Sequence, residues 1–133
     1  MVLREVLHAH IPYLRAESTV RDAVDRMDIY QFPALVFVDA ENRLLAVITE
    51  GDLSRAVSKS DSFVQMGKEM AISFATKDPF SASVDMEIGA ALHEMLMRGL
   101  TILPVVEGGI LSGIVLRVDL MQAILADANS PTD

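Results

Sequence analysis

The strongest constraint on the fold of this chain is that its two halves repeat one another. When the sequence is slid along itself, apolar residues fall on apolar residues through both halves, with one single-residue gap after Asp39 and Glu107. The paired positions are Ala23/Ala91, Val24/Leu92, Met27/Met95, Leu35/Leu103 and Val38/Val106, then Leu44/Leu111, Asp52/Asp119, Leu53/Leu120 and Ala56/Ala123. This agreement indicates two copies of one unit of about 60 residues, covering 11–58 and 80–128.

The first copy predicts five elements in the order β-α-β-β-α. A short strand at 13–14 precedes Thr19-x-x-Asp22, which is a capping-box pattern, and the apolar residues that follow have helical spacing. The stretches "ALVFVD" and "LLAVIT" flank the polar turn "AENR" and predict a hairpin. A short helix over 53–58 closes the copy.

The second copy predicts the same order. Ile88, Leu92 and Met95 form the apolar stripe of a helix, "ILPVVE" and "LSGIVL" are strands, Gly108-Gly109 is the turn between them, and 119–125 is the closing helix. Because so small a sheet cannot bury a core alone, we expect an α+β fold in which two β-α-β-β-α repeats pack against each other with pseudo-two-fold symmetry. We assign 1–58 to the first repeat, 59–72 to a linker and 73–133 to the second repeat, with the last few residues disordered.

Composition excludes several classes of protein and site. The chain has 133 residues, a net charge of −8 and no cysteine, so disulfides and thiolate metal sites are excluded. No apolar run is long enough for a membrane span, and the acidic charge opposes binding to nucleic acid or to an anionic membrane surface. The N-terminus lacks the pattern of a signal peptide, and we expect a cytoplasmic protein.

The order of the elements and the ends of the two copies resemble the cystathionine-β-synthase (CBS) domain, and the tandem pair resembles a Bateman module. The stretch "ATKDPFSASVDMEIGAAL" is similar to the opening of such a domain, and "LPVVE…LSGIVLRVDL" to its end. The resemblance implies a regulatory module that binds an adenosine-containing small molecule: AMP, ADP, ATP or S-adenosylmethionine. It also implies a homodimer, which in this family has the shape of a flat disc. A further implied partner is an unidentified protein that the module regulates.

The family's ribose-binding pattern is Gly-h-x-Thr/Ser-x-x-Asp/Asn, where h is apolar. The first copy matches it at Val47, Thr49 and Asp52 but has Ala46 at the glycine position. The second copy keeps Gly113, Ile114 and Asp119 but has Leu116 in place of the hydroxyl residue. A carboxylate can accept hydrogen bonds from both hydroxyls of a ribose, so the resemblance implies a main site at Asp52 and a weaker one at Asp119.

Thr49-x-x-Asp52 has a second interpretation, which is a capping box with no ligand. Most Thr-x-x-Asp sequences ahead of an apolar run are only helix caps. The alternative function is therefore a structural or protein-interaction module that binds no ligand at either site and dimerises through its helices.

The resemblance also implies that the partner repeat completes each pocket. For the Asp52 site the implied residues are Thr76, Lys77, Asp78, Pro79, Phe80, Leu100, Thr101 and Ile102. Lys77 is the cation placed to meet a phosphate, or else a solvated loop lysine. Thr101 and Ile102 stand where some family members carry basic residues, so ATP ranks below AMP, ADP and S-adenosylmethionine. For the Asp119 site the implied residues are Ile114, His10, Ile11 and Pro33.

No catalytic arrangement is visible in the sequence. There is no phosphate loop, nucleophile elbow or carboxylate pair with a third member. We therefore expect a protein that is not an enzyme, needs no cofactor and binds no metal. Of the eight methionines, Met97 falls outside the apolar stripe of its helix, which favours a role in self-association.

Overall fold

The computed structural model describes residues 1–128, so the expectation about the last few residues lies outside the described part. The chain forms two compact units. The middle unit is Pro12–Pro79, and the outer unit joins Met1–Ile11 to the chain from Phe80 onward. The repeats of the sequence and the compact units therefore have different boundaries.

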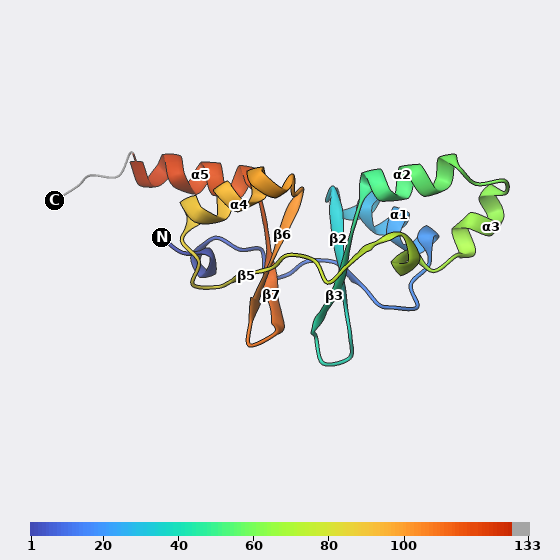
Figure 1. The fold of residues 1–133 in the computed structure, drawn as a ribbon, viewed down its shortest axis with the longest axis horizontal. Helices are drawn as coiled ribbons and strands as arrows, with labels where there is room; N and C mark the ends of the chain where they lie inside the picture. Colours follow the sequence, from blue (N-terminus) through green and yellow to red (C-terminus); the bar gives the residue numbers. More distant parts are fainter. Residues whose placement is uncertain (129–133) are drawn as a thin grey trace. The chain divides into compact units, whose positions relative to one another are not determined.

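The middle unit is built on a four-stranded sheet in the order β1-β2-β3-β4. Strands β2 (Ala34–Val38) and β3 (Leu44–Thr49) form the predicted hairpin. β1 (Tyr13–Leu14) pairs with β2 in parallel, and β4 (Thr76–Lys77) pairs with β3 in antiparallel orientation. Helices α1 (Val20–Tyr30) and α2 (Glu50–Ser58) lie on one face of this sheet (Figure 1).

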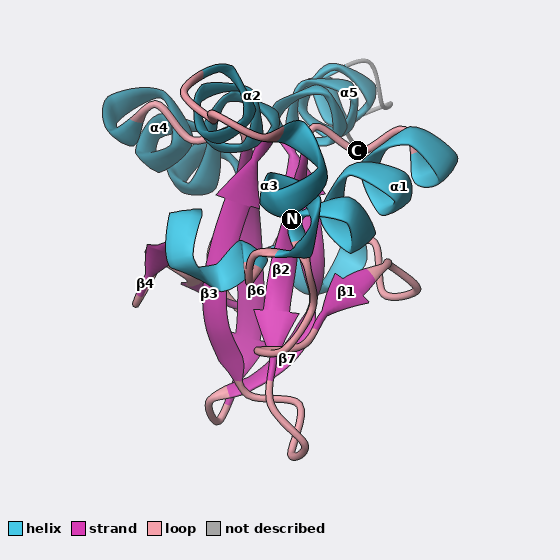
Figure 2. Ribbon diagram, turned by 90° about the vertical axis from the view of Figure 1, so that its right-hand side faces the viewer, coloured by secondary structure: helices cyan, strands magenta, loops and turns pink. Residues whose placement is uncertain are grey.

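Two short helices complete the middle unit. They are α3 (Phe63–Lys68) and the 3₁₀ helix η2 (Ala71–Phe74). The hydrophobic core includes the fully buried side chains Leu14, Ala23, Phe37, Ala46, Ile48 and Ala71. Val24 was predicted on the apolar stripe of α1, but 42% of it is exposed, because it faces away from the sheet beside the buried Ala23. Figure 2 shows the strands β1, β2 and β3 side by side.

The outer unit has a three-stranded sheet in the order β5-β6-β7. β5 (Ala82–Ser83) pairs in parallel with β6 (Ile102–Glu107), which forms a hairpin with β7 (Ile110–Leu116). Helices α4 (Ile88–Arg98) and α5 (Arg117–Ala128) pack on one face of this sheet (Figure 1). The α+β class and the two repeats are confirmed, and the packing of the repeats with pseudo-two-fold symmetry stays a prediction.

The N-terminal segment is part of the outer unit. Its 3₁₀ helix η1 (Leu3–Glu5) buries Leu3 completely among Val84, Ile88 and other core residues of that unit. The Leu3 N–H donates to the Met86 carbonyl over 3.0 Å, and His8 exchanges two backbone hydrogen bonds with Ile114. Because these contacts join residues far apart in sequence, the repeat boundary at 1–58 does not describe a compact body.

Backbone turns and helix ends follow the sequence. Gly108 and Gly109, the predicted turn of the second hairpin, both have positive φ. Helix α4 ends at Gly99 in the left-handed conformation, where glycine avoids the strain of a side chain. Within residues 1–128, no helix combines the length and the apolar character needed to cross a membrane.

Candidate functional site

The candidate site begins where β3 runs directly into α2. Thr49 ends the strand and caps the helix: its Oγ1 accepts from the Asp52 N–H over 3.1 Å, and its own N–H donates to Asp52 Oδ2 over 2.9 Å. The predicted capping box is therefore present. The ligand-binding role of the same two residues stays a prediction.

The second carboxylate oxygen of Asp52 faces a cation. Arg55 Nη2 lies 2.7 Å from Oδ1, and the two side chains are 65% and 19% exposed respectively. Gly51 makes room for this arrangement, because a Cβ there would come within 3.2 Å of Arg55 Nη1. An exposed ion pair contributes at most about 1 kcal/mol, so a ribose that offers two hydroxyls can compete with the guanidinium for this oxygen.

Edge strand β4 carries further predicted residues and pairs with the middle of β3. Thr76 pairs with Val47 in the sheet register, and Lys77 pairs with Ala46. The Asp78 N–H donates to the Leu45 carbonyl over 3.4 Å, and Asp78 has positive φ. Seven of the predicted residues therefore belong to this one unit: Val47, Thr49, Asp52, Thr76, Lys77, Asp78 and Pro79.

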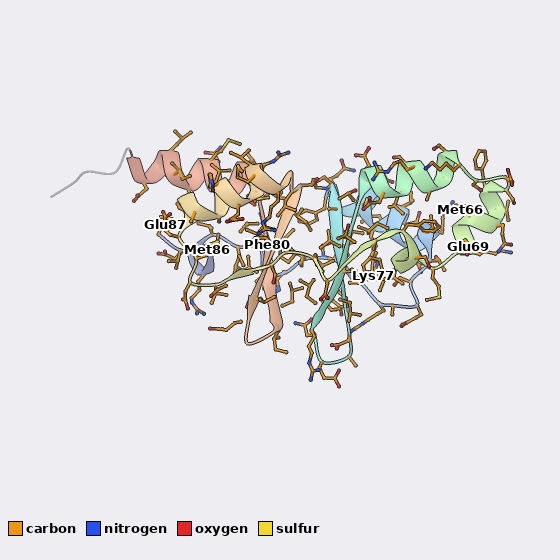
Figure 3. All side chains as sticks on the ribbon, viewed as in Figure 1. Met66, Glu69, Lys77, Phe80, Met86 and Glu87 are labelled. Carbon is orange, nitrogen blue, oxygen red and sulfur yellow. The ribbon has the colours of Figure 1, made fainter. Side chains whose placement is uncertain are left out.

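The side chains of β4 are accessible to a ligand. Thr76, Lys77 and Asp78 are exposed and Pro79 is half-buried, and Figure 3 marks Lys77 on its strand. Strand β4 was not predicted from the sequence. A two-residue strand offers no alternation to detect, and β4 exists because its partner β3 is already fixed in the hairpin.

The four remaining residues of the predicted main site belong to the outer unit. The Arg98 guanidinium lies over the Phe80 ring at 3.8 Å from its centroid, so one face of that ring is already covered. Ile102 is only 3% exposed and pairs with Leu116 in the sheet. Leu100 and Thr101 are half-buried. The part that these four residues play in a pocket stays a prediction.

The second candidate site has a different arrangement at the start of α5. Asp119 Oδ2 accepts from the Leu116 N–H over 2.8 Å and also lies 2.8 Å from His8 Nε2. Leu116 has no hydroxyl, so the reciprocal half of a capping box is missing here. Within residues 1–128, no hydrogen bond or ion pair is made by Asp119 Oδ1.

The residues predicted beside Asp119 come from both units, and their part in a common site stays a prediction. Ile114 belongs to β7 and pairs through its backbone with His8, whereas His10 is exposed and Ile11 is half-buried. Pro33 belongs to the middle unit, where its carbonyl accepts from the Glu50 N–H of α2. His8, the residue that contacts Asp119, begins the segment 8–12 that the family resemblance implies for this site, although only His10 and Ile11 of that segment were named as contacts.

A site for a metal ion does not emerge from the geometry. In the part of the chain that the structure describes, no three histidine, aspartate or glutamate side chains stand close enough to hold one. His8 and His10 are both exposed, and His8 contacts the carboxylate of Asp119.

Comparison with known proteins identifies the family. The model of the CBS domain matches residues 3–59 and again 71–126. A 17.7 kDa uncharacterized protein of Acidianus ambivalens, from the bps2 3′ region, is 35% identical over 113 residues, which are 84% of this chain. The chain spans 66% of that relative's length, and 34% of another curated relative, from Rickettsia prowazekii.

Solved structures show the same fold. CBSX2 in complex with AMP matches with a TM-score of 0.85 at 18% identity, covering 96% of this chain and 98% of that one. The CBS domain pair of MJ0100, in complex with 5′-methylthioadenosine and S-adenosyl-L-methionine, matches with a TM-score of 0.77 at 19% identity, covering 96% and 98%. With both halves matched by the family model, this chain belongs to the CBS domain family and carries two copies of the domain.

Proposed function

We propose that this CBS pair is a sensor of an adenosine-containing small molecule and regulates a protein partner. In the middle unit the contacts would be Thr49 and Asp52 at the start of α2, Val47 on β3, and the edge strand Thr76–Lys77 with Asp78 and Pro79. CBSX2 holds AMP and the MJ0100 pair holds S-adenosyl-L-methionine, which supports this class of ligand.

The observation that carries the proposal is that the middle unit contains a hydroxyl, a carboxylate and the main-chain groups of an edge strand. A hydroxyl and a carboxylate stand at the first turn of α2, and β4, the last strand of the sheet order, pairs with Ala46 and Val47 of β3, two to three residues before Thr49. A carboxylate accepts hydrogen bonds from adjacent ribose hydroxyls, and an edge strand offers main-chain groups to the rim of a base. The N-terminus of α2 also favours a negative charge on the ligand.

The charges near the site favour a ligand with little negative charge. Lys77 lies on β4, and Arg55 is engaged by Asp52. The chain as a whole carries a net charge of −8, which opposes highly charged anions. We therefore rank AMP, ADP and S-adenosylmethionine above ATP.

The test uses a matched pair of carboxylates. Asp22 makes the same capping box in α1 as Asp52 makes in α2, with hydrogen bonds of the same lengths, 2.9 and 3.1 Å. Asp52→Asn and Asp22→Asn should therefore both lower the free energy of unfolding, and Asp52→Asn should lower it more because it also weakens the pair with Arg55. Calorimetric titration with AMP, ADP, ATP and S-adenosylmethionine should show that only Asp52→Asn loses binding, and equal affinities in the two variants would refute the assignment.

The alternative function is a structural or interaction module with empty sites. It is favoured by the finding that both carboxylate oxygens of Asp52 already have partners in the chain. Exposed apolar side chains on the helices, such as Ile29 at 71% and Met97 at 72%, would then serve a homodimer.

Thermal unfolding separates the two functions. A ligand at 100 times its dissociation constant should stabilise the native protein by about 2.7 kcal/mol. If no adenosine compound raises the unfolding temperature and sedimentation equilibrium shows a dimer, the interaction module is the better description. Loss of the dimer in Met97→Glu would then locate the interface.

A further inference from the structure

A pocket opens on the side of α2 that faces α3 and η2, and it shares Asp52 with the proposed adenosine site. It has a volume of about 380 Å³ and lies wholly within the middle unit. Its lining is Asp52, Arg55, Ala56, Lys59, Met66 and Phe74. Three α2 residues and the C-cap residue Lys59 are spaced i, i+3, i+4 and i+7, which places them along one stripe of the helix surface.

One wall of the pocket is cationic. Arg55 and Lys59 stand one helical turn apart on this stripe, with the small, buried Ala56 between them. The Arg55 guanidinium uses Nη2 for Asp52, and a guanidinium has five N–H donors in all. Among residues 1–128, no carboxylate forms an ion pair with Lys59. After the Arg55–Asp52 pair is counted, the pocket therefore keeps one uncompensated positive charge in an acidic protein.

The opposite wall is apolar. Met66 of α3 and Phe74 of η2 are half-buried, and both pack against the core of the middle unit. Figure 3 marks Met66 on α3, next to α2. A thioether and an aromatic ring together provide a polarisable surface that suits a flat ring.

We propose that this pocket is a second ligand site, which takes a small aromatic carboxylate. The carboxylate would pair with Lys59 and with the free donors of Arg55, and the ring would lie between Met66 and Phe74. One positive charge matches one carboxylate, whereas the C-terminal end of α2 and Asp52 both oppose a more highly charged anion. The proposal rests on this pocket alone and does not depend on adenosine binding.

The experiment is an NMR titration of the whole chain, labelled with ¹⁵N, with sodium 1-naphthoate as the probe. The amide signals of Arg55 to Lys59, Met66 and Phe74 should shift in a saturable way. The uncharged 1-naphthalenemethanol should bind more weakly. Lys59→Met should weaken naphthoate binding roughly two- to five-fold, the loss of one exposed ion pair.

Lys68→Met is the matched control, because Lys68 is an exposed lysine at the end of α3 that does not line the pocket. It should bind naphthoate as the unaltered chain does, and both variants should keep the native spectrum outside the substituted site. Shifts gathered at Thr49 to Gly51 and at Thr76 to Asp78 would place the probe in the proposed adenosine site and overturn the inference. Shifts gathered at Val24, Leu53 and Phe63, equal affinity for the alcohol, or no saturable shift would overturn it as well.

Discussion

The starts of α2 and α5 occupy equivalent positions in the two repeats, yet their acids are used differently. Asp52 is bound by neighbours, the Thr49 N–H and Arg55, three residues away on either side. Asp119 is bound on one side by Leu116 and on the other by His8, across 111 residues of sequence. The equivalent aspartate caps the start of α2 in the first repeat, and in the second repeat it contacts a segment that is distant in sequence. A duplicated motif therefore does not imply a duplicated role.

The residue at the glycine position of the ribose pattern shows the same contrast. In the middle unit Ala46 is fully buried and pairs with Lys77 of β4. In the outer unit a Cβ on Gly113 would overlap the carbonyl oxygen of His8. A glycine permits a close approach by ligand or backbone, because it has no Cβ. In the outer unit the backbone of the N-terminal segment makes that approach.

The largest expected effect comes from removing the anchor of that segment. Leu3→Ala should lower the free energy of unfolding of the outer unit by about 2–5 kcal/mol, because Leu3 is fully buried in its core. Hydrogen exchange should show faster opening of β6 and β7, while β2 and β3 keep their protection. Equal loss of protection in both hairpins would mean that the two units do not unfold separately.

The next largest effect is expected at Gly113, which is compared with Ala46 at the equivalent position of the first repeat. Gly113→Ala should destabilise the chain by about 2–3 kcal/mol, since the backbone at His8 must move to admit the methyl group. Ala46→Gly should cost about 1 kcal/mol, from backbone entropy and a lost buried methyl group. Urea denaturation measures both, and equal values would break the contrast between the repeats.

A smaller effect is expected at the cap of α2. Thr49→Val keeps the shape of the side chain but leaves the Asp52 N–H without its acceptor, at a cost of about 1 kcal/mol. Thr19→Val removes the equivalent acceptor from α1 and provides the control of equal cost. A much larger loss at Thr49 in thermal denaturation would show that this residue supports more than its helix.

The smallest effect is a dependence on pH that is confined to the outer unit. Hydrogen bonds from the Gly89 and Ala90 N–H groups lower the pKa of Glu87 below its ordinary 4.5, and a hydrogen bond from Arg4 lowers the pKa of Glu107. A lowered pKa means that the ionised group stabilises the folded state above its ordinary pKa. This contribution is lost as the pH falls through the lowered value.

The melting temperature is measured between pH 6 and pH 3. This is roughly the range that contains the ordinary pKa of a glutamate. The double variant Glu87→Gln, Glu107→Gln should show a shallower decline than the unaltered chain. An unchanged slope would indicate that other carboxylates govern the acid response.

The sequence predicted those elements whose cause is local. The β2–β3 hairpin follows from two apolar runs around a polar turn, and α1 from a capping box before apolar residues at helical spacing. The start of α2 was placed at Leu53 but lies at Glu50, directly after Thr49, because the cap sets the first turn. Local patterns therefore fixed the type of each element better than its bounds.

The features that escaped prediction depend on distant partners. Strand β4 exists through its pairing with β3, and η1 through the burial of Leu3 in the outer unit. The Asp52–Arg55 pair was open to prediction from the i, i+3 spacing, whereas the His8–Asp119 contact required knowledge of which unit holds the N-terminal segment.

That segment also imposes an order on synthesis. Residues 1–11 are synthesised before the middle unit, but their partners at Ile114 and Asp119 are synthesised after it. At roughly 5–20 residues per second, the middle unit is complete several seconds before the segment can reach its place. During translation the exposed Leu3, Val6 and Leu7 are a natural target for a chaperone, and a pause before β7 would lengthen that exposure.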